Sequence, residues 1–325
     1  MDNLFGINKE GSLTWYHKYR QRMPANQVKL LSLWDKLSIP HKMHKQLFRE
    51  KLTIIGIKVN ANSLMLTLPK KSLEELLGEL DKFTTWSKTK QGTSWTLRCW
   101  QKMAGWLNWS FNVFPHLRLA LNTFYPKIAG KEQALMKIWV NNEVQQDLNW
   151  AMGHMRESLR IRLLTFISWD SEDVDETIFC DACMLGTGFW FPAQCEGFYA
   201  LMPVDAVQEI IFYFEALAIT CAIDNLKMRA VDYSKIILYT DSMNTVNIFN
   251  SLQCLPEFNT LLCFSVDMCL SKKLDMHVLH IPGEQNLVAD TISHYNFDKA
   301  QTLVPGLTIS NFKPPQLATL GAAKK

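Results

Sequence analysis

The chain has 325 residues, of which 48% are hydrophobic and 20% are charged. This balance is typical of a globular protein that can form more than one hydrophobic core, and it excludes a disordered chain. The eight cysteines are too scattered for a disulfide-stapled secreted scaffold, and we find neither a secretory leader nor an uninterrupted membrane-spanning stretch. We therefore expect an intracellular protein of the cytoplasm or nucleus, with no membrane partner.

The net charge of +3 conceals two halves of opposite sign. Residues 1–162 contain 25 Lys and Arg against 12 Asp and Glu, whereas residues 163–325 contain 9 against 19. Nine of the eleven tryptophans also lie in the basic half. Cations interleaved with flat rings suit a polyanion with stackable bases, although a solvated basic surface over a Trp-rich core explains the same numbers. The acidic half could then hold the cations that act on the phosphates.

The first half is expected to combine a small sheet with helices. Apolar residues at helical spacing within 13–38 predict a helix up to Leu37. Two β-rich runs, 52–59 and 63–68, flank an Asn-containing turn and predict a hairpin. Further helical patterns follow at 71–81 and 93–108.

After an acidic connector at 170–176, the pattern becomes that of an α/β domain. Short apolar runs of strand length alternate with helical runs, so we predict a mixed sheet whose later strands are joined by crossovers. Strands are expected at 177–181, 186–191, 196–200, 235–240 and 276–281, and helices at 204–228, from 244, at 258–270 and at 286–293. The proline-containing residues 301–325 are expected to form a loosely attached tail.

Two acidic residues occupy positions where a charge is costly. Asp181 lies inside an otherwise apolar predicted strand. Glu215 interrupts the stripe that Ile211, Ile219 and Ala222 form on one helix face. An unpaired carboxylate in such a place costs several kcal/mol or becomes protonated. Both residues therefore need a compensating partner.

Two further acids lie at the ends of predicted elements, where they can meet Asp181 and Glu215. Asp241 ends a buried-type strand, and Asp290 lies near the first turn of the last predicted helix. Singly, each is explained by an exposed turn or strand end. If all four acids converge, their repulsion requires divalent cations, and two Mg²⁺ ions about 4 Å apart are an arrangement used for phosphodiester cleavage. We therefore expect Asp181, Glu215, Asp241 and Asp290 to hold two Mg²⁺ or Mn²⁺ ions.

The segments that carry the four acids have a distinctive sequence. The longest, from His280 to Ser293, contains Pro-Gly-x-x-Asn-x-x-Ala-Asp. The others are Phe-Cys-Asp-Ala at 179–182 with Gly186 and Gly188, Phe-Glu-Ala-Leu at 214–217, and Tyr-Thr-Asp-Ser at 239–242. Together they resemble the ribonuclease H (RNase H) domain of retroelement reverse transcriptases. The resemblance implies an RNase H-like mixed sheet with flanking helices, the four acids as catalytic metal ligands, and the RNA strand of an RNA–DNA hybrid as substrate.

One position departs from that family. Many ribonucleases H carry a histidine in the loop before the last aspartate, and here that loop contains Glu284 and Gln285. We expect product release or proton handling to differ accordingly.

The basic half carries a second resemblance. Ile-Pro-His-Lys at 39–42 with Lys-Gln at 45–46, Ile-Ile-Gly-Ile at 54–57, and Ala-Gly-Trp-Leu-Asn-Trp at 104–109 with Pro115 resemble the region after the polymerase active site of retroelement reverse transcriptases, especially those of the tyrosine-recombinase type. That region includes the primer-gripping hairpin and the thumb or connection. The resemblance implies a small α+β palm remnant with this hairpin at 1–70, a helical thumb or connection region at 71–162, an RNase H-like domain at 163–300 and a tail at 301–325.

The resemblance also implies a C-terminal fragment of such an enzyme. Met1 to Gly6 is similar to the stretch that follows the family's Tyr-x-Asp-Asp turn, and only Asp2 remains of the polymerase carboxylates. Because phosphoryl transfer by a polymerase requires carboxylates that hold two metal ions, we expect no polymerase activity from this chain alone.

Other candidate sites are weaker. Cys180 and Cys183 have a zinc-like spacing, but odd spacing in a strand puts their sulfurs on opposite faces, and no second ligand pair follows. His41 and His44 are expected to be surface residues and His280 to be a strand residue beside the site. Gly186-x-Gly188 suits a hairpin turn better than a phosphate-binding loop.

Two functions therefore compete. The first is a metal-dependent endonuclease that cleaves the RNA of RNA–DNA hybrids; the second is a catalytically inactive remnant that only binds nucleic acid. Transposases and integrases are excluded because their acids occur in the order Asp, Asp, Glu, and related exonucleases because Cys183 stands where their Asp-x-Glu motif has its glutamate. The sequence indicates no oligomeric state.

Overall fold

The computed structural model describes residues 11–60, 62–63, 65–85, 93–157, 161–162, 171–201, 211–227, 229, 232 and 234–315. The chain divides into two compact units. Unit 1 comprises Met1–Glu74 and Ser158–Leu164, and unit 2 comprises Glu75–Glu157 and Thr165–Lys325. Across the described ranges no helix is both long and apolar enough to cross a membrane.

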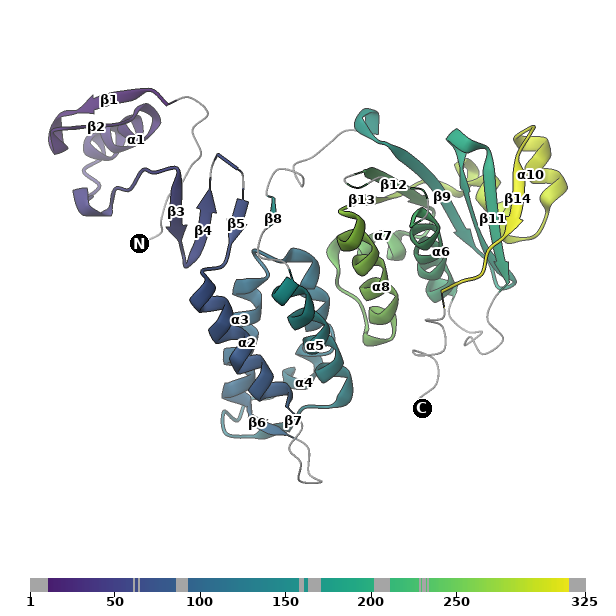
Figure 1. The fold of residues 1–325 in the computed structure, drawn as a ribbon, viewed down its shortest axis with the longest axis horizontal. Coiled ribbons are helices and arrows are strands. Elements are labelled where there is room, and N and C mark those ends of the chain that lie inside the picture. The colour runs from purple at the N-terminus through teal and green to yellow at the C-terminus, as the bar shows by residue number, and fades with distance from the viewer. Residues whose placement is uncertain are drawn as a thin grey trace. The chain divides into compact units, whose positions relative to one another are not determined.

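The described part of unit 1 starts with a strand pair followed by a helix (Figure 1). β1 (Leu13–Tyr16) pairs antiparallel with β2 (Gln21–Pro24), and α1 (Ala25–Lys36) follows. The helix predicted within 13–38 is therefore right only from Ala25 onward. The β-forming run of β1 precedes it, and Pro24, at the N-cap of α1, marks the start of the helix.

The other described strands of unit 1 form a small antiparallel sheet in the order β3-β4-β5-β8. Its strands are β3 (Lys51–Ile54), β4 (Ile57–Asn60), β5 (Met65–Thr67) and β8 (Ile161–Arg162). The predicted turn between β4 and β5 is present, but the run predicted as one strand at 52–59 folds back on itself at Ile55-Gly56. Both turn residues have positive φ, 49° and 80°, as a tight two-residue hairpin turn requires. An isoleucine in this conformation is unusual, which is why the pattern read as continuous strand.

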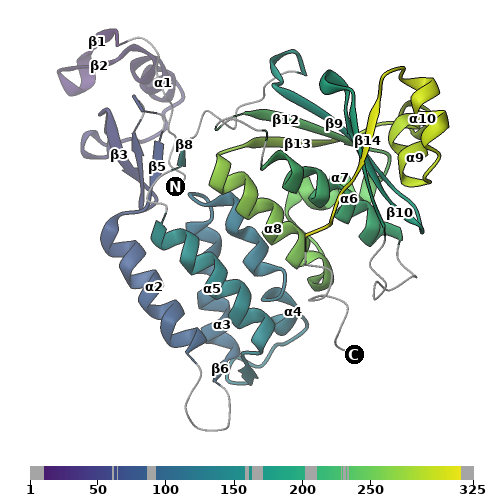
Figure 2. The same ribbon diagram turned by 45° about the vertical axis from the view of Figure 1, so that its right-hand side comes forward.

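Unit 2 contains a helical region before its large sheet (Figure 2). The rings of Phe83, Trp100 and Phe124 contact one another in its core, with the centroids of Trp100 and Phe124 4.6 Å apart. Part of the Trp-rich composition is therefore structural, since Trp100 is fully buried. The elements are α2 (Lys70–Thr84), which begins in unit 1, β6 (Ser94–Thr96), α3 (Leu97–Ser110), η3 (Pro115–Leu121), α4 (Tyr125–Ile128), β7 (Lys137–Trp139) and α5 (Asn142–Glu157).

Hydrogen bonds join this helical region to the domain that follows. Asp147 on α5 accepts hydrogen bonds from Thr123 Oγ1 at 2.6 Å and from Asn259 Nδ2 at 2.9 Å. Trp150 Nε1 donates to Asp267 Oδ1 at 2.7 Å. Polar side chains thus connect α5 with the helix α8 (Pro256–Lys272).

The remainder of unit 2 is a six-stranded mixed sheet in the order β13-β12-β9-β10-β11-β14. In chain order, the first three strands of this sheet, β9, β10 and β11, form an antiparallel meander. Strand β12 runs parallel to β9, and β13 runs parallel to β12. The strands are β9 (Glu176–Ala182), β10 (Gly186–Phe191), β11 (Glu196–Leu201), β12 (Lys235–Thr240), β13 (Asp275–His280) and β14 (Thr308–Asn311). The mixed α/β class predicted from the sequence is confirmed, and this sheet with its flanking helices is compatible with an RNase H-like fold.

Helices cover both faces of the sheet (Figure 2). α6 packs on β9 and β10 over a core that includes Cys180, Phe189 and Phe191, with α8 against it, whereas α9 lies on β9, β10 and β11. The helices are α6 (Ile211–Leu226), α7 (Met243–Ser251), α8, α9 (Leu287–Ser293) and α10 (Phe297–Leu303). The helix predicted at 204–228 corresponds to α6, and its predicted start lies outside the described residues.

The predicted tail is partly folded. Residues 301–303 end α10, and β14 pairs parallel with β11 at the edge of the sheet. Leu307, only 2% exposed, packs with Ile292 beneath this strand. The tail prediction is therefore wrong for 301–311, because the prolines of this region flank a short strand of sequence Thr-Ile-Ser-Asn and do not interrupt it.

Candidate metal centre

Asp181 lies near the end of β9 and is 5% exposed. Its Oδ2 accepts a hydrogen bond of 2.6 Å from Ser293 Oγ on α9. On β10 the residue directly opposite Asp181 is Gly188. A Cβ at Gly188 would lie 2.5 Å from the Ser293 backbone nitrogen and 2.7 Å from the Ala289 carbonyl oxygen. Only glycine therefore allows α9 to approach the sheet closely enough to meet Asp181.

Two side chains anchor the ends of α9. Asn286, 1% exposed, donates from Nδ2 to the Cys180 carbonyl oxygen at 2.9 Å, beside Asp181 on β9. Tyr295 donates its hydroxyl to the Leu185 carbonyl oxygen at 2.8 Å. The asparagine of the Pro-Gly-x-x-Asn-x-x-Ala-Asp run thus ties the start of α9 to the strand that carries Asp181.

The two glycines predicted to form a hairpin turn have another role. Gly186 and Gly188 lie within β10, and the turn precedes them. A Cβ at Gly186 would lie less than 2 Å from the Tyr295 hydroxyl. Because both glycines lack a side chain, the segment that carries Asp290 can pack closely against β10. The prediction that they form a hairpin turn is therefore wrong.

Glu215 and Asp241 approach from the other elements. Glu215 on α6 is 8% exposed, and the Thr240 hydroxyl lies 3.5 Å from its Oε2. Asp241 follows β12 directly and is exposed. The loop after β13 passes close to it, since a Cβ at Gly283 would lie 3.2 Å from Asp241 Oδ2. The ends of β12 and β13 thus form the rim of the centre.

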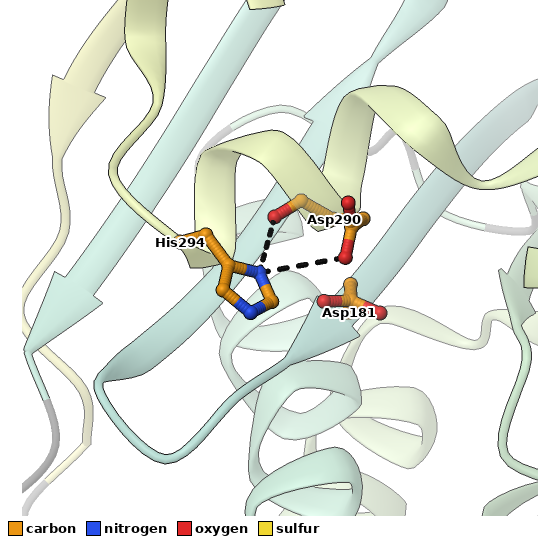
Figure 3. Close-up of side chains that lie close together, drawn as sticks. All are labelled: Asp181, Asp290 and His294. Carbon is orange, nitrogen blue, oxygen red and sulfur yellow. Dashed lines mark hydrogen bonds and ion pairs between the residues drawn. The ribbon is translucent and has the colours of Figure 1, made fainter.

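All four predicted acids meet around Asp181. One oxygen each from Asp181, Glu215 and Asp241 lie within 4.8 Å of one another. A second group joins Asp181 and Asp290 with a ring nitrogen of His294, within the same limit (Figure 3). His294 was not among the predicted residues. Its signal in the sequence is its position four residues after Asp290, which places both on one helix face.

Burial makes ionisation of the inner acids costly. It raises the pKa of Glu215 to about 9, with a further contribution from the charges of Asp181 and Asp241. It also raises the pKa of Asp181 to about 7, although the hydrogen bond from Ser293 favours the ionised form. Among the described residues no lysine or arginine forms an ion pair with any of the four acids. Bound cations would supply the missing positive charge.

The donor set fits hard divalent cations. Four carboxylates offer the oxygen ligands that Mg²⁺ and Mn²⁺ prefer, and the two groups share Asp181. A zinc–thiolate site does not fit, because burial raises the pKa of the Cys180 thiol well above its usual range. Cys183 instead donates from its thiol to the Ser293 carbonyl oxygen at 3.1 Å.

Of the described histidines, only His294 belongs to either group. His44 and His280 are exposed. His41, predicted to be a surface residue, has a side chain only 2% exposed, and its Nε2 lies 2.9 Å from Asp35 Oδ1 within unit 1. That prediction is therefore wrong, since a network with Tyr16, Tyr19 and Asp35 encloses the ring.

Comparisons with known proteins give a weak structural likeness. No protein family model and no curated protein sequence matches the chain. Among solved structures, a foamy viral protease-reverse transcriptase in complex with dsDNA is similar over 79% of this chain and 52% of that chain, with 13% identity and a TM-score of 0.31. The chain thus spans about half the length of that protein. Because this likeness is weak, the functional inference depends on the residues of the centre.

Proposed function

We propose that this chain is an RNase H-type endonuclease that depends on divalent cations and cleaves the RNA strand of RNA–DNA hybrids. One observation carries the proposal: four carboxylates from β9, α6, the end of β12 and α9 converge, and the inner two are buried with no ion pair to a lysine or arginine of the described residues. A purely structural role would place two carboxylates in a low-dielectric environment with hydroxyl hydrogen bonds but no lysine or arginine to balance their charge.

The residues of the centre have separate tasks in this proposal. Asp181, which belongs to both groups, and Glu215 would bind the cations from the protein side. Asp241 and Asp290 would bind them from the exposed side, where the phosphate backbone of a duplex can reach. Divalent cations bound there supply Lewis-acid activation of water and of the scissile phosphate, which leaves a 3′-hydroxyl end on the RNA. Ser293 keeps the Asp181 carboxylate oriented through its hydrogen bond.

The basic, aromatic part of the chain would hold the duplex. On α3, Arg98 and Lys102 are exposed, and Lys102 Nζ lies 5.3 Å from the centroid of the Trp106 ring. Such a surface suits contacts to phosphates, whose strength falls with salt. In this proposal 1–70 and 71–162 correspond to the palm remnant and the thumb or connection region, and the chain alone does not extend primers.

A cleavage assay tests the proposal. The purified chain is incubated with an end-labelled RNA–DNA hybrid in Mg²⁺ or Mn²⁺, with single-stranded RNA and double-stranded DNA as comparison substrates. Asp181→Asn and Asp241→Asn should abolish cleavage of the hybrid. Asp298→Asn, an exposed acid on α10, is the matched control and should cleave at the wild-type rate.

The assay also distinguishes the rival function. If the wild-type chain binds the hybrid but is as inert as Asp181→Asn in both metals, the chain is a nucleic-acid-binding remnant and the endonuclease proposal is wrong.

A further inference from the structure

We propose that His294 makes the Asp290 side of the centre a mixed carboxylate–imidazole site that binds Mn²⁺ in preference to Mg²⁺. This inference rests on the proposed function in one respect, namely that the same carboxylates bind cations. It adds a ligand outside the four acids and a difference in metal preference between the two sides.

The geometry of α9 places the imidazole beside the acids. His294 Nδ1 lies 3.4 Å from Asp290 Oδ1 and 3.0 Å from the Asp290 carbonyl oxygen (Figure 3). A ring nitrogen of His294 and oxygens of Asp181 and Asp290 lie within 4.8 Å of one another. Two ligands bound to one ion at about 2.1 Å are about 3 Å apart when adjacent and about 4.2 Å apart when opposite. Small side-chain rotations therefore suffice to bring all three onto one ion.

The ring nitrogen nearest to Asp290 is Nδ1, and it is the atom that the ring offers to a cation. When Nε2 carries the proton, Nδ1 keeps its lone pair and can bind an ion in place of its contact with the Asp290 carbonyl oxygen. The anchors of α9, Asn286 and Tyr295, hold the helix from which the ring extends.

The two sides of the centre then differ in ligand chemistry. Asp181, Glu215 and Asp241 form an all-oxygen group, and oxygen ligands suit both Mg²⁺ and Mn²⁺. The other group contains an imidazole nitrogen, a softer ligand that binds first-row transition ions better than Mg²⁺. The side chains of His294 and Asp290 are 52% and 44% exposed, so an ion can reach this side from solvent.

Electron paramagnetic resonance on the full chain tests the inference without reference to activity. Free Mn²⁺ is counted by its six-line spectrum, Mg²⁺ is measured by competition, and pulsed measurements detect coupling of bound Mn²⁺ to a nitrogen nucleus. The variants are His294→Asn, Asp181→Asn and the control His44→Asn, an exposed histidine of unit 1. Circular dichroism verifies that each variant is folded.

We expect nitrogen coupling in the wild type and in His44→Asn, and none in His294→Asn. His294→Asn should weaken Mn²⁺ binding about tenfold or more while changing Mg²⁺ binding less than about twofold. Nitrogen coupling that persists in His294→Asn, or equal weakening of both metals, would overturn the inference. In either case loss of Mn²⁺ binding in Asp181→Asn would still support the proposed function, whereas a wild-type chain that binds neither metal overturns both.

Discussion

The candidate centre has an inner and an outer side that differ in exposure. The inner acids, Asp181 and Glu215, are 5% and 8% exposed, whereas Asp241, Asp290 and His294 face solvent to a large extent. The inner side therefore carries most of the electrostatic cost of the site, because desolvation is what raises its pKa values. The outer side costs little stability because its groups remain solvated. Substitution of a buried inner acid should therefore change both stability and cleavage, whereas substitution of an exposed outer acid should change cleavage alone.

The largest effect should come from the acid that both groups share. Asp181→Asn should reduce hybrid cleavage at least about 10³-fold, equivalent to about 4 kcal/mol in the barrier. It should also remove cation binding from both groups, because Asp181 belongs to each. Calorimetric titration with Mn²⁺ measures the stoichiometry, and Asp241→Asn is the comparison. If Asp181→Asn retains as many bound ions as Asp241→Asn, Asp181 is not a ligand that the two groups share.

The next effect concerns the close approach of α9 to the sheet. Gly188→Ala forces a Cβ into the backbone of α9, so it should destabilise the fold by about 3 kcal/mol and displace Asp290. We expect hybrid cleavage to fall about 10²-fold. Denaturant unfolding measures the stability.

Gly153→Ala on α5 is the matched control for this prediction. No atom lies within 4 Å of a Cβ at that position, so the same substitution should stabilise the helix by about 0.5–1 kcal/mol. Equal stability changes in the two variants would show that α9 does not depend on Gly188.

A third prediction separates the inner from the outer side directly. Without metal, the raised pKa of Glu215 means that the folded state binds the proton more tightly than the unfolded state. This contribution to stability is present below about pH 4.5 and is lost as the pH rises toward 9. Glu215→Gln should therefore stabilise the metal-free chain at pH 8 by about 1–3 kcal/mol while abolishing cleavage.

The outer acid provides the contrast for that prediction. Asp241→Asn should abolish cleavage with no change in metal-free stability beyond about 0.5 kcal/mol, because Asp241 is already solvated. Thermal unfolding in a chelator across pH 5–9 measures both variants. A destabilised Glu215→Gln would mean that the buried carboxylate is compensated within the protein.

The smallest effect should come from a buried acid outside the centre. Burial raises the pKa of Asp147 to about 6, and its oxygen accepts hydrogen bonds from Thr123 and Asn259. Its contribution to stability is present below about pH 4 and lost as the pH rises through 6. Asp147→Asn keeps an acceptor for both donors, so it should flatten this pH dependence by about 1–2 kcal/mol and leave Mn²⁺ binding unchanged. Altered Mn²⁺ binding in this variant would mean that the centre is coupled to the helical region.

Much of the sheet could be predicted from local pattern. The apolar runs at 177–181, 186–191 and 235–240 are strands because their composition demands burial on both faces. The pattern failed where backbone geometry overrides side-chain preference, as at Ile55, whose left-handed conformation splits an apparent strand. It also failed at β14, a strand that exists only because the edge of β11 is available for pairing.

The sequence by itself determined that Asp181 and Glu215 stand in apolar surroundings and that Asp241 and Asp290 lie at the ends of core elements. Those facts follow from residue order, because a charged residue within a pattern of apolar residues can be recognised in the sequence without coordinates. Only the tertiary structure decided that the four acids share Asp181 as their meeting point and that His294 joins them. Distances between side chains on different elements depend on how closely the elements pack, and here that closeness depends on the missing side chain of Gly188 and the hydrogen bond of Asn286.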